Sequence, residues 1–560
     1  MGFQDCEYVE EGPTKTEQLE EQIAVLEARI EELEKPRELR ASGTFQSPVV
    51  GGRRAASLPA LSRGGSPRLV YSTLSYSEIP SPTTMPTVSG GIPLPELESL
   101  VHNFLQHCTL FGFFLHIRNF AEAALGRSGP RPLPALLHAV HLWAIHLSGN
   151  EELVANYEAQ YLSRTLRSAV GALSTASNNI LHAIQAEVLI SQYFFRTTRF
   201  LEGKYHLSAA VSLVLSSGLH RLRSAEVAAG NRGFLSAAPQ TRSPTVDPLD
   251  DMERVAAFWT VLTMNNCWTT ADGSPSNLAY TSSGSDARID TPWPVDPVKA
   301  IKVSMPPSLI YLQNSGVVEL ELSFGTVNAF LANVPDTATS IPALHSKSAI
   351  LFERASRLVD TYRPDLNPSQ LAEFYDSFNS LEALIHGFLS KLPEPNSTTT
   401  MHTAREVFLI HSLSRVALIQ LHNPFVDVAG NSHIARRQAL DAARGIVAIL
   451  TLILPNDFVF VDPITGVSFP TSAPLVQLFT SLSFQTLFMA TAQVFIGELD
   501  RYRRSQAVGQ VWDGDMDEQH LMDAVEIVLA TMNIFAPTCR LMNSQLQIMH
   551  RAYHSVSSRP

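Results

Sequence analysis

The chain has 560 residues, of which 45% are hydrophobic and 17% are charged, and its formal net charge is −12. This length is too great for a single hydrophobic core, so we expect two or three domains. The negative charge argues against a protein that coats nucleic acid over its whole surface.

A short heptad pattern lies near the N-terminus. Leucine and isoleucine alternate at steps of four and three residues, at Leu19, Ile23, Leu26, Ile30 and Leu33. Leucine at the d positions with isoleucine at the a positions favours a parallel two-stranded coiled coil. Thr14 and Glu17 form a capping box, and Pro36 ends the helix. We therefore predict a dimerisation helix over residues 14–35, with a single amphipathic helix that packs on its own domain as the open alternative.

The charges around this helix are uneven. Residues 1–34 hold Asp5 and ten glutamates against Lys15 and Arg29, a balance of −9. A bZIP protein needs a basic helix directly before its zipper, so this class is excluded. Residues 36–92 are rich in Ser, Pro, Gly and Arg without an apolar period, which predicts a disordered linker.

Helical periodicity begins at about residue 93 and continues to the C-terminal region. Apolar faces predict helices at 97–108, 136–147, 151–172, 179–198, 203–217, 251–270, 346–361, 368–391, 402–422, 433–453, 474–498 and 517–533. We expect loops at 224–247 and 271–345, and weak strand candidates at 307–312 and 457–460. The predicted fold class is all-α: a large irregular helical domain after a short parallel coiled coil and a linker.

No class of membrane or secreted protein fits the sequence. The most apolar run, residues 446–454, is about half the length of a membrane-spanning helix. The acidic N-terminus lacks the apolar stretch of a secretory signal. We therefore expect no membrane partner. The four cysteines lie far apart and form no paired motif, so we also expect no disulfide framework.

One acidic motif has residues that could bind a metal ion. Asp250, Asp251 and Glu253 resemble the metal site of all-α terpenoid synthases, where aspartates hold Mg²⁺ and a diphosphate. The second metal motif of those enzymes is absent from the sequence. We therefore favour an acidic helix N-terminus that complements the helix dipole.

The histidines of the predicted helices do not form a metal-ligand pattern. Their spacings do not converge on one ion at His138, His141 and His146, or at His402 and His411. We interpret them as core or surface residues. We expect no catalytic residue and no cofactor site in these 560 residues.

Three later stretches occur in an order that belongs to a known family. Residues 97–120 are rich in aromatic side chains, and residues 203–221 end in Gly218, Leu219, His220 and Arg221. The third stretch runs from Glu253 and Arg254 through Phe258, Trp259, Gly273 and Pro275 to residues 289–294. Together they resemble the regulatory ("middle homology") domain of fungal zinc-cluster transcription factors. Asn265 stands where many members carry aspartate.

This resemblance implies a nuclear, fungal-specific regulator of RNA polymerase II genes, with the transcription machinery and a homodimer or heterodimer partner. It implies a regulatory core over residues 93–300 and a C-terminal helical part of the same region over 301–560. Cys6, within residues 1–13, resembles the last ligand of the family's zinc cluster. One thiolate cannot hold zinc, so we expect zinc and DNA binding only with an upstream cluster. The alternatives are a truncated partner that inhibits full-length paralogues and a terpenoid-synthase-like enzyme.

The motif residues themselves predict structural roles. Gly218 falls where a helix ends in a left-handed residue, and Leu219 and His220 turn the chain back into the core, with His220 as a hydrogen-bonded core residue. Phe258 and Trp259 lie on an apolar helix face, where we expect Trp259 to be buried near this turn. Gly273 and Pro275 mark the turn after that helix.

Overall fold

The computed structural model describes residues 92–175, 179–223, 248–278, 288–296, 325–363, 365–394, 401–427, 432–452, 487–537 and 539–558. All described residues belong to one compact unit, Ser89–Pro560. The predicted remnant at 1–13 with Cys6, the coiled coil with its five apolar positions, and the linker up to residue 91 lie outside the described residues. The strand candidates at 307–312 and 457–460 also lie outside them.

The described residues form 15 α-helices and no strand, which confirms the all-α prediction. One hydrophobic core extends from Ile92 to Val556. Residues on both sides of position 300 contribute to this core, so the two parts that we distinguished there belong to one compact unit. No helix among the described residues has the length and apolar character needed to cross a membrane.

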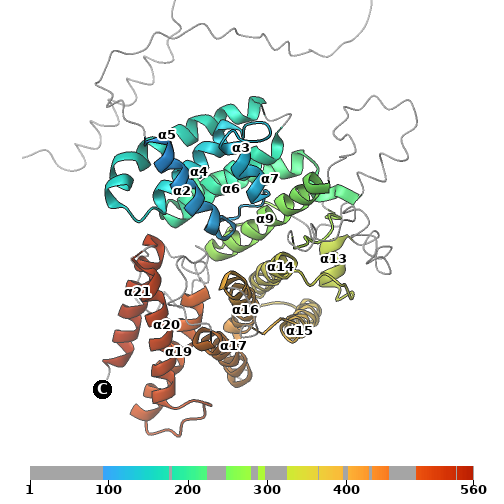
Figure 1. The fold of residues 1–560 in the computed structure, drawn as a ribbon. Helices are drawn as coiled ribbons and strands as arrows, with labels where there is room; N and C mark the ends of the chain where they lie inside the picture. The colour runs from blue at the N-terminus through green and yellow to red at the C-terminus, as the bar shows by residue number, and fades with distance from the viewer. Residues whose placement is uncertain are drawn as a thin grey trace, which may run out of the picture. The chain divides into compact units, whose positions relative to one another are not determined.

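The N-terminal half of the unit is a helical layer drawn in blue and teal in Figure 1. Its centre is occupied by α4, which begins with a proline in its first turn and is buried on nearly every side. Trp143 of α4 stacks on Phe111 with ring centroids 4.2 Å apart. The helices are α2 (Leu94–His107), α3 (Ile117–Ala124), α4 (Pro134–His146), α5 (Glu151–Thr175), α6 (Ile180–Arg196) and α7 (Phe200–Ser216).

Helix α9 (Pro248–Asp272) lies between the two halves (Figure 1). It packs against α6 and α7 on one side and against α14 (Ile341–Asp360) on the other. Every side chain from Val261 to Ala271 is buried, so this part of the helix is covered on all sides. A helix that is covered on all sides belongs at the centre of a domain.

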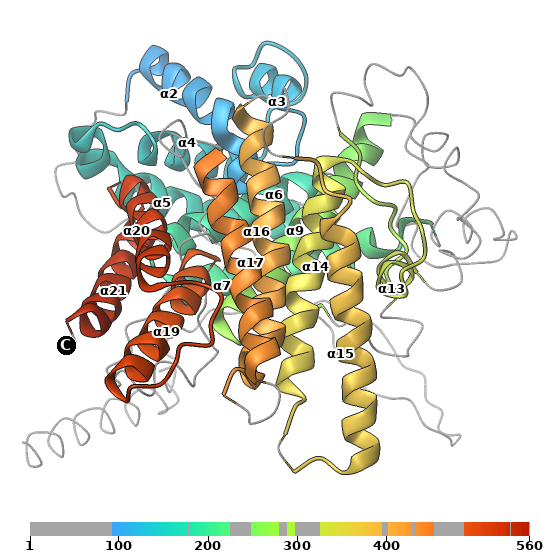
Figure 2. The ribbon, with the colours of Figure 1, turned by 90° about the horizontal axis from the view of Figure 1, so that it is seen from below.

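The C-terminal half consists of two groups of helices (Figure 2). Helix α15 begins at a capping box in which Asn367 and Gln370 each bond the other's backbone, and Asp517 caps α20. The helices are α13 (Thr326–Leu331), α14, α15 (Pro368–Leu389), α16 (Met401–His422), α17 (Ser432–Leu452), α19 (Leu487–Ala507), α20 (Glu518–Phe535) and α21 (Arg540–Ser557).

Several predicted boundaries are wrong. The expected loop at 271–345 contains α13 and the first turn of α14, and the extended segment at 288–296 lies within it. The described part of the helix expected at 474–498 begins at Leu487 and continues to Ala507. Helices α3 and α21 were not predicted. The loop expected at 224–247 lies outside the described residues.

Candidate functional site

The turn after α7 is built as the sequence predicts. The helix ends at Ser216, and Gly218 follows with φ +71°, in the left-handed region that glycine enters without a steric penalty. A Cβ at this position would meet nothing within 4 Å, so the backbone conformation alone favours glycine. The predicted left-handed conformation of Gly218 is confirmed.

This turn is bonded to the extended segment at 288–296. The N–H of Asp290 donates to the carbonyl of His220 (3.0 Å), and the hydroxyl of Thr291 donates to the carbonyl of Leu219 (2.5 Å). The Asp290 carboxylate accepts from the backbone N–H of Arg223 (3.2 Å). Asp290 and Thr291 are fully buried, so their polar groups bind the turn and not solvent.

His220 departs from its predicted role. Leu219 is buried as expected, but the His220 side chain is only partly buried. Its Nδ1 is buried and has no hydrogen-bond partner among the described residues. The prediction of a hydrogen-bonded core histidine is therefore wrong at this atom, because the backbone of His220, and not its ring, joins the neighbouring segment. Burial and, second, the nearby Arg221 lower its pKa.

Trp259 lies on the other side of the same segment. It is 1% exposed, and its indole Nε1 donates to the carbonyl of Pro292 (2.6 Å). Its ring stacks on Trp293 with centroids 4.3 Å apart, and Phe258 beside it is fully buried. The predicted burial of Trp259 near the turn is confirmed, and residues 290–293 connect the two.

The cluster continues to a buried lysine that the sequence reasoning missed. Lys347 of α14 is 5% exposed, and its ammonium donates to Asp336 (2.6 Å) and to the carbonyl of Ala338 (2.9 Å). The same nitrogen lies 5.0 Å from the ring centroid of Trp293 and 5.6 Å from that of Phe330. A carboxylate and two aromatic faces together compensate the burial of the charge.

The turn after α9 also follows the prediction. Gly273 has φ +68°, and the N–H of Ser274 donates to the carboxylate of Asp272 (2.9 Å). Pro275 follows in the same turn. The Asn265 amide donates to the hydroxyl of Ser276 (2.8 Å) and thereby holds this turn against α9.

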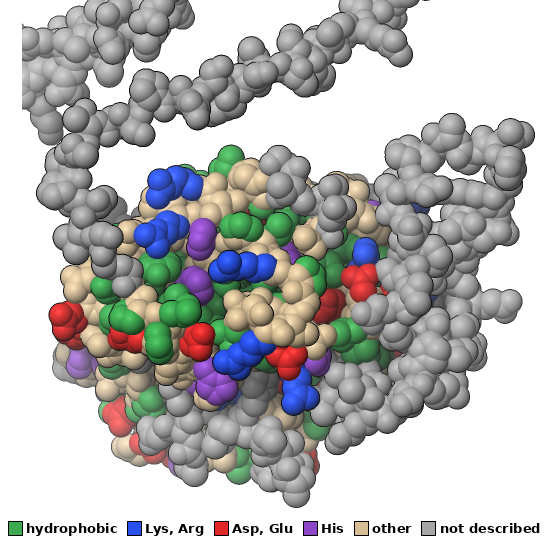
Figure 3. Space-filling view, turned by 45° about the horizontal axis from the view of Figure 1, so that its top comes forward, with side chains coloured by type: hydrophobic (Ala, Val, Ile, Leu, Met, Phe, Trp, Pro, Cys, Tyr) green, Lys and Arg blue, Asp and Glu red, His purple; other side chains and the backbone are tan. Residues whose placement is uncertain are grey.

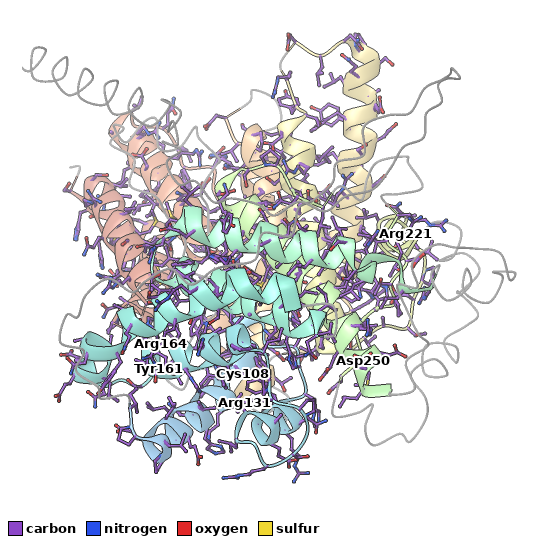
Figure 4. All side chains as sticks on the ribbon, turned by 90° about the horizontal axis from the view of Figure 1, so that it is seen from above. Cys108, Arg131, Tyr161, Arg164, Arg221 and Asp250 are labelled. Carbon is purple, nitrogen blue, oxygen red and sulfur yellow. The ribbon has the colours of Figure 1, made fainter. Side chains whose placement is uncertain are left out.

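The acidic motif at the start of α9 binds protein groups. Asp250 pairs with Arg254 one turn later (2.7 Å). Glu253 accepts from the backbone N–H of His116 (2.8 Å), a residue of the N-terminal layer. These contacts favour the interpretation of the acidic motif as a helix N-terminus. In Figure 4, Asp250 lies on the same side of the molecule as Arg221, the last residue of the turn after α7.

The histidines noted in the sequence do not converge. His138 bonds the Ser168 hydroxyl (2.7 Å), His146 bonds Glu158 (2.6 Å), and His411 bonds the carbonyl of Pro393 (3.0 Å). The side chain of His402 lies outside the described residues. Within the described ranges, no group of three or more His, Cys, Asp or Glu side chains could hold a metal ion.

Comparison with known proteins identifies no relative. No protein-family model matches the chain, and no curated protein and no solved structure shows significant similarity to it. The arrangement at the centre of the unit is therefore described by its contacts: a buried junction in which the turn at Gly218, the tryptophan of α9 and the lysine of α14 meet one extended segment.

Proposed function

We propose that the chain is a nuclear transcription regulator of the fungal zinc-cluster kind, whose helical unit is the regulatory domain. The observation that carries the proposal is the junction around residues 289–293. The second stretch that resembles the family, 203–221, bonds to the third through Thr291, and Trp259 and Pro292 join the two ends of the third stretch to each other. Stretches that occur in a family's order and also contact one another support a common domain.

In this proposal the helical unit responds to partners and the predicted coiled coil pairs two chains, as a homodimer or with a related factor. We place contact with the transcription machinery on the helical unit. DNA recognition requires a zinc cluster, and Cys6 by itself cannot form one. The proposal therefore assigns no DNA-reading module to residues 1–560.

A tethering experiment tests the proposal. The 560-residue chain is fused to an unrelated DNA-binding domain in a fungal host that carries a reporter gene with the matching site. We expect a change in reporter transcription and accumulation of the fusion in the nucleus. Absence of both would refute the proposal.

Two variants show whether the junction matters. Thr291→Val removes the hydroxyl that bonds Leu219, and we expect a weaker reporter response at equal protein level. Arg444→Gln changes an exposed side chain of α17 that pairs with Asp441 one turn away, and it should respond like the unaltered chain. Equal responses of the two variants would separate the junction from regulation.

A further inference from the structure

Three arginines of the N-terminal layer differ from most other arginines of the described residues because they form no ion pair. Arg131, Arg164 and Arg167 have no carboxylate within ion-pair distance in the described part of the chain. The guanidinium of Arg164 lies 5.1 Å from the centroid of the Tyr161 ring, and Arg167 donates to the carbonyl of Ser163 (3.2 Å). By contrast, carboxylates bind many arginines elsewhere on the unit, among them Arg118, Arg254, Arg357, Arg437, Arg444 and Arg503.

Two histidines of α4 lie beside these arginines. His141 meets the Tyr161 ring edge-on at 6.0 Å, and His138 bonds Ser168 of α5. Burial, then His138 and then Arg131, lower the pKa of His141 to about 4. Burial and then Arg164 lower the pKa of His138. Every charged neighbour that acts on these two rings is cationic or can become so.

Other histidines of the same layer show what is missing here. Glu158 lies 2.6 Å from His146, and Glu187 lies 2.6 Å from His206. In both pairs a carboxylate of the chain itself occupies the position next to the ring. In the part of the chain that the structure describes, no carboxylate bonds the ring of His138 or His141, so the positive charge of the three arginines is open to an external anion.

The surface around the group combines charge with an apolar side chain. Val170 is 79% exposed and lies one helical turn beyond Arg167 on α5. Arg131, Tyr161 and Arg164 lie on one side of the molecule in Figure 4, away from Asp250. On the face in Figure 3, several Lys, Arg and His side chains lie at the upper left with apolar side chains between them, and charges of both signs lie lower and to the right.

We propose that the patch formed by Arg131, His138, His141, Arg164 and Arg167 binds an acidic peptide segment of a partner protein. Planar guanidinium groups match carboxylates with two parallel hydrogen bonds. An apolar side chain of the same segment would cover Val170.

The charge of the whole chain favours a peptide over a nucleic acid. The net charge of −12 repels a long polyanion, whereas a short acidic segment contacts only the local positive patch. This inference rests on the contacts of α4 and α5 and holds whether or not the proposed function is correct.

Binding of a fluorescent glutamate-rich peptide with one leucine to the full chain tests the inference. We expect saturable binding that weakens with salt. The double substitution Arg164→Gln with Arg167→Gln should weaken it by about tenfold or more, because charge-assisted contacts are lost. The matched control is Arg437→Gln with Arg444→Gln, which removes the same charge from exposed pairs on α17 and should bind as the unaltered chain does.

A second measurement distinguishes a specific site from general attraction. Bound carboxylates should raise the pKa of His138 and His141, measured by NMR on the chain with and without peptide. Equal loss of affinity in both double variants would overturn the proposal, as would no binding by the unaltered chain. Tighter binding of a single-stranded oligonucleotide with the same number of charges would also overturn it and assign the patch to nucleic acid.

Discussion

Replacing Trp259 by phenylalanine tests the central junction with little change in volume. The substitution keeps a large ring against Trp293 but removes the Nε1–H that donates to the carbonyl of Pro292 at 2.6 Å. Pro292 is buried, so its carbonyl loses this donor in a place that water does not reach. An unsatisfied buried acceptor costs about 1–3 kcal/mol, and we expect the free energy of unfolding to fall by that amount.

Replacing Trp259 by alanine removes the ring as well. The side chain is 1% exposed, so nearly all of its surface is lost from the core. Truncation of a buried Trp or Phe costs about 3–5 kcal/mol, and this cost already includes the lost hydrogen bond. Because domains are stable by about 5–15 kcal/mol, the alanine variant should be poorly folded.

Guanidinium denaturation followed by circular dichroism measures both variants, since tryptophan fluorescence changes with the substitution itself. Trp512→Phe is the matched control: its Nε1 also donates to a carbonyl, that of Met516 at 2.8 Å, but the side chain is only partly buried. We expect the control to lose less than about 1 kcal/mol. Equal stability of Trp259→Phe and Trp512→Phe would refute the reasoning, and a stable Trp259→Ala chain that fails to respond to an effector would indicate a binding pocket.

Three further predictions follow from the sequence and the contacts. A peptide of residues 1–40 should form a weak parallel dimer that Leu26→Glu abolishes, because an unpaired charge would be buried in the seam; equal sedimentation of both peptides would contradict this. The purified chain should carry no stoichiometric zinc and no sequence-specific DNA affinity, and about two zinc ions per chain by mass spectrometry would refute this. Burial lowers the pKa of His146, so this side chain binds a proton less readily in the folded chain than in the unfolded chain. The free energy of unfolding should therefore have its full value above about pH 6.5 and decrease as the pH drops below that value. Urea denaturation at about pH 7.5 and pH 5.5 measures this loss, which His146→Gln should reduce.

Elements with local signals were predicted closely. The helix expected at 368–391 occupies Pro368–Leu389, because Asn367, Pro368 and Gln370 specify its start by themselves. Helix α21 had a signal that was overlooked: Met542, Leu546 and later apolar residues recur at helical spacing among polar ones. Helix α3 has only eight residues, too few for a clear period.

In the candidate site, too, local features could be predicted from the sequence and contacts between distant residues could not. The conformation of Gly218 follows from its position after a helix and could be predicted locally. The bond from Trp259 to Pro292 joins residues 33 apart, and Lys347 reaches Trp293 from another helix. Such contacts depend on how the helices pack, which the apolar period of each helix alone does not specify.

The physical reason lies in what an all-α unit must do with its loops. A loop that passes through the core has no neighbouring strand, so its N–H and carbonyl groups need partners from another turn or from helix side chains. Gln185 of α6 shows this: it is fully buried, and its amide accepts from the N–H of Phe114 (2.7 Å) and donates to the carbonyl of Gly112 (3.0 Å). Glu253 does the same for His116. A polar residue on an apolar helix can therefore look like part of a catalytic motif in the sequence, as Glu253 does beside Asp250, when the group that it binds is the backbone of a distant loop.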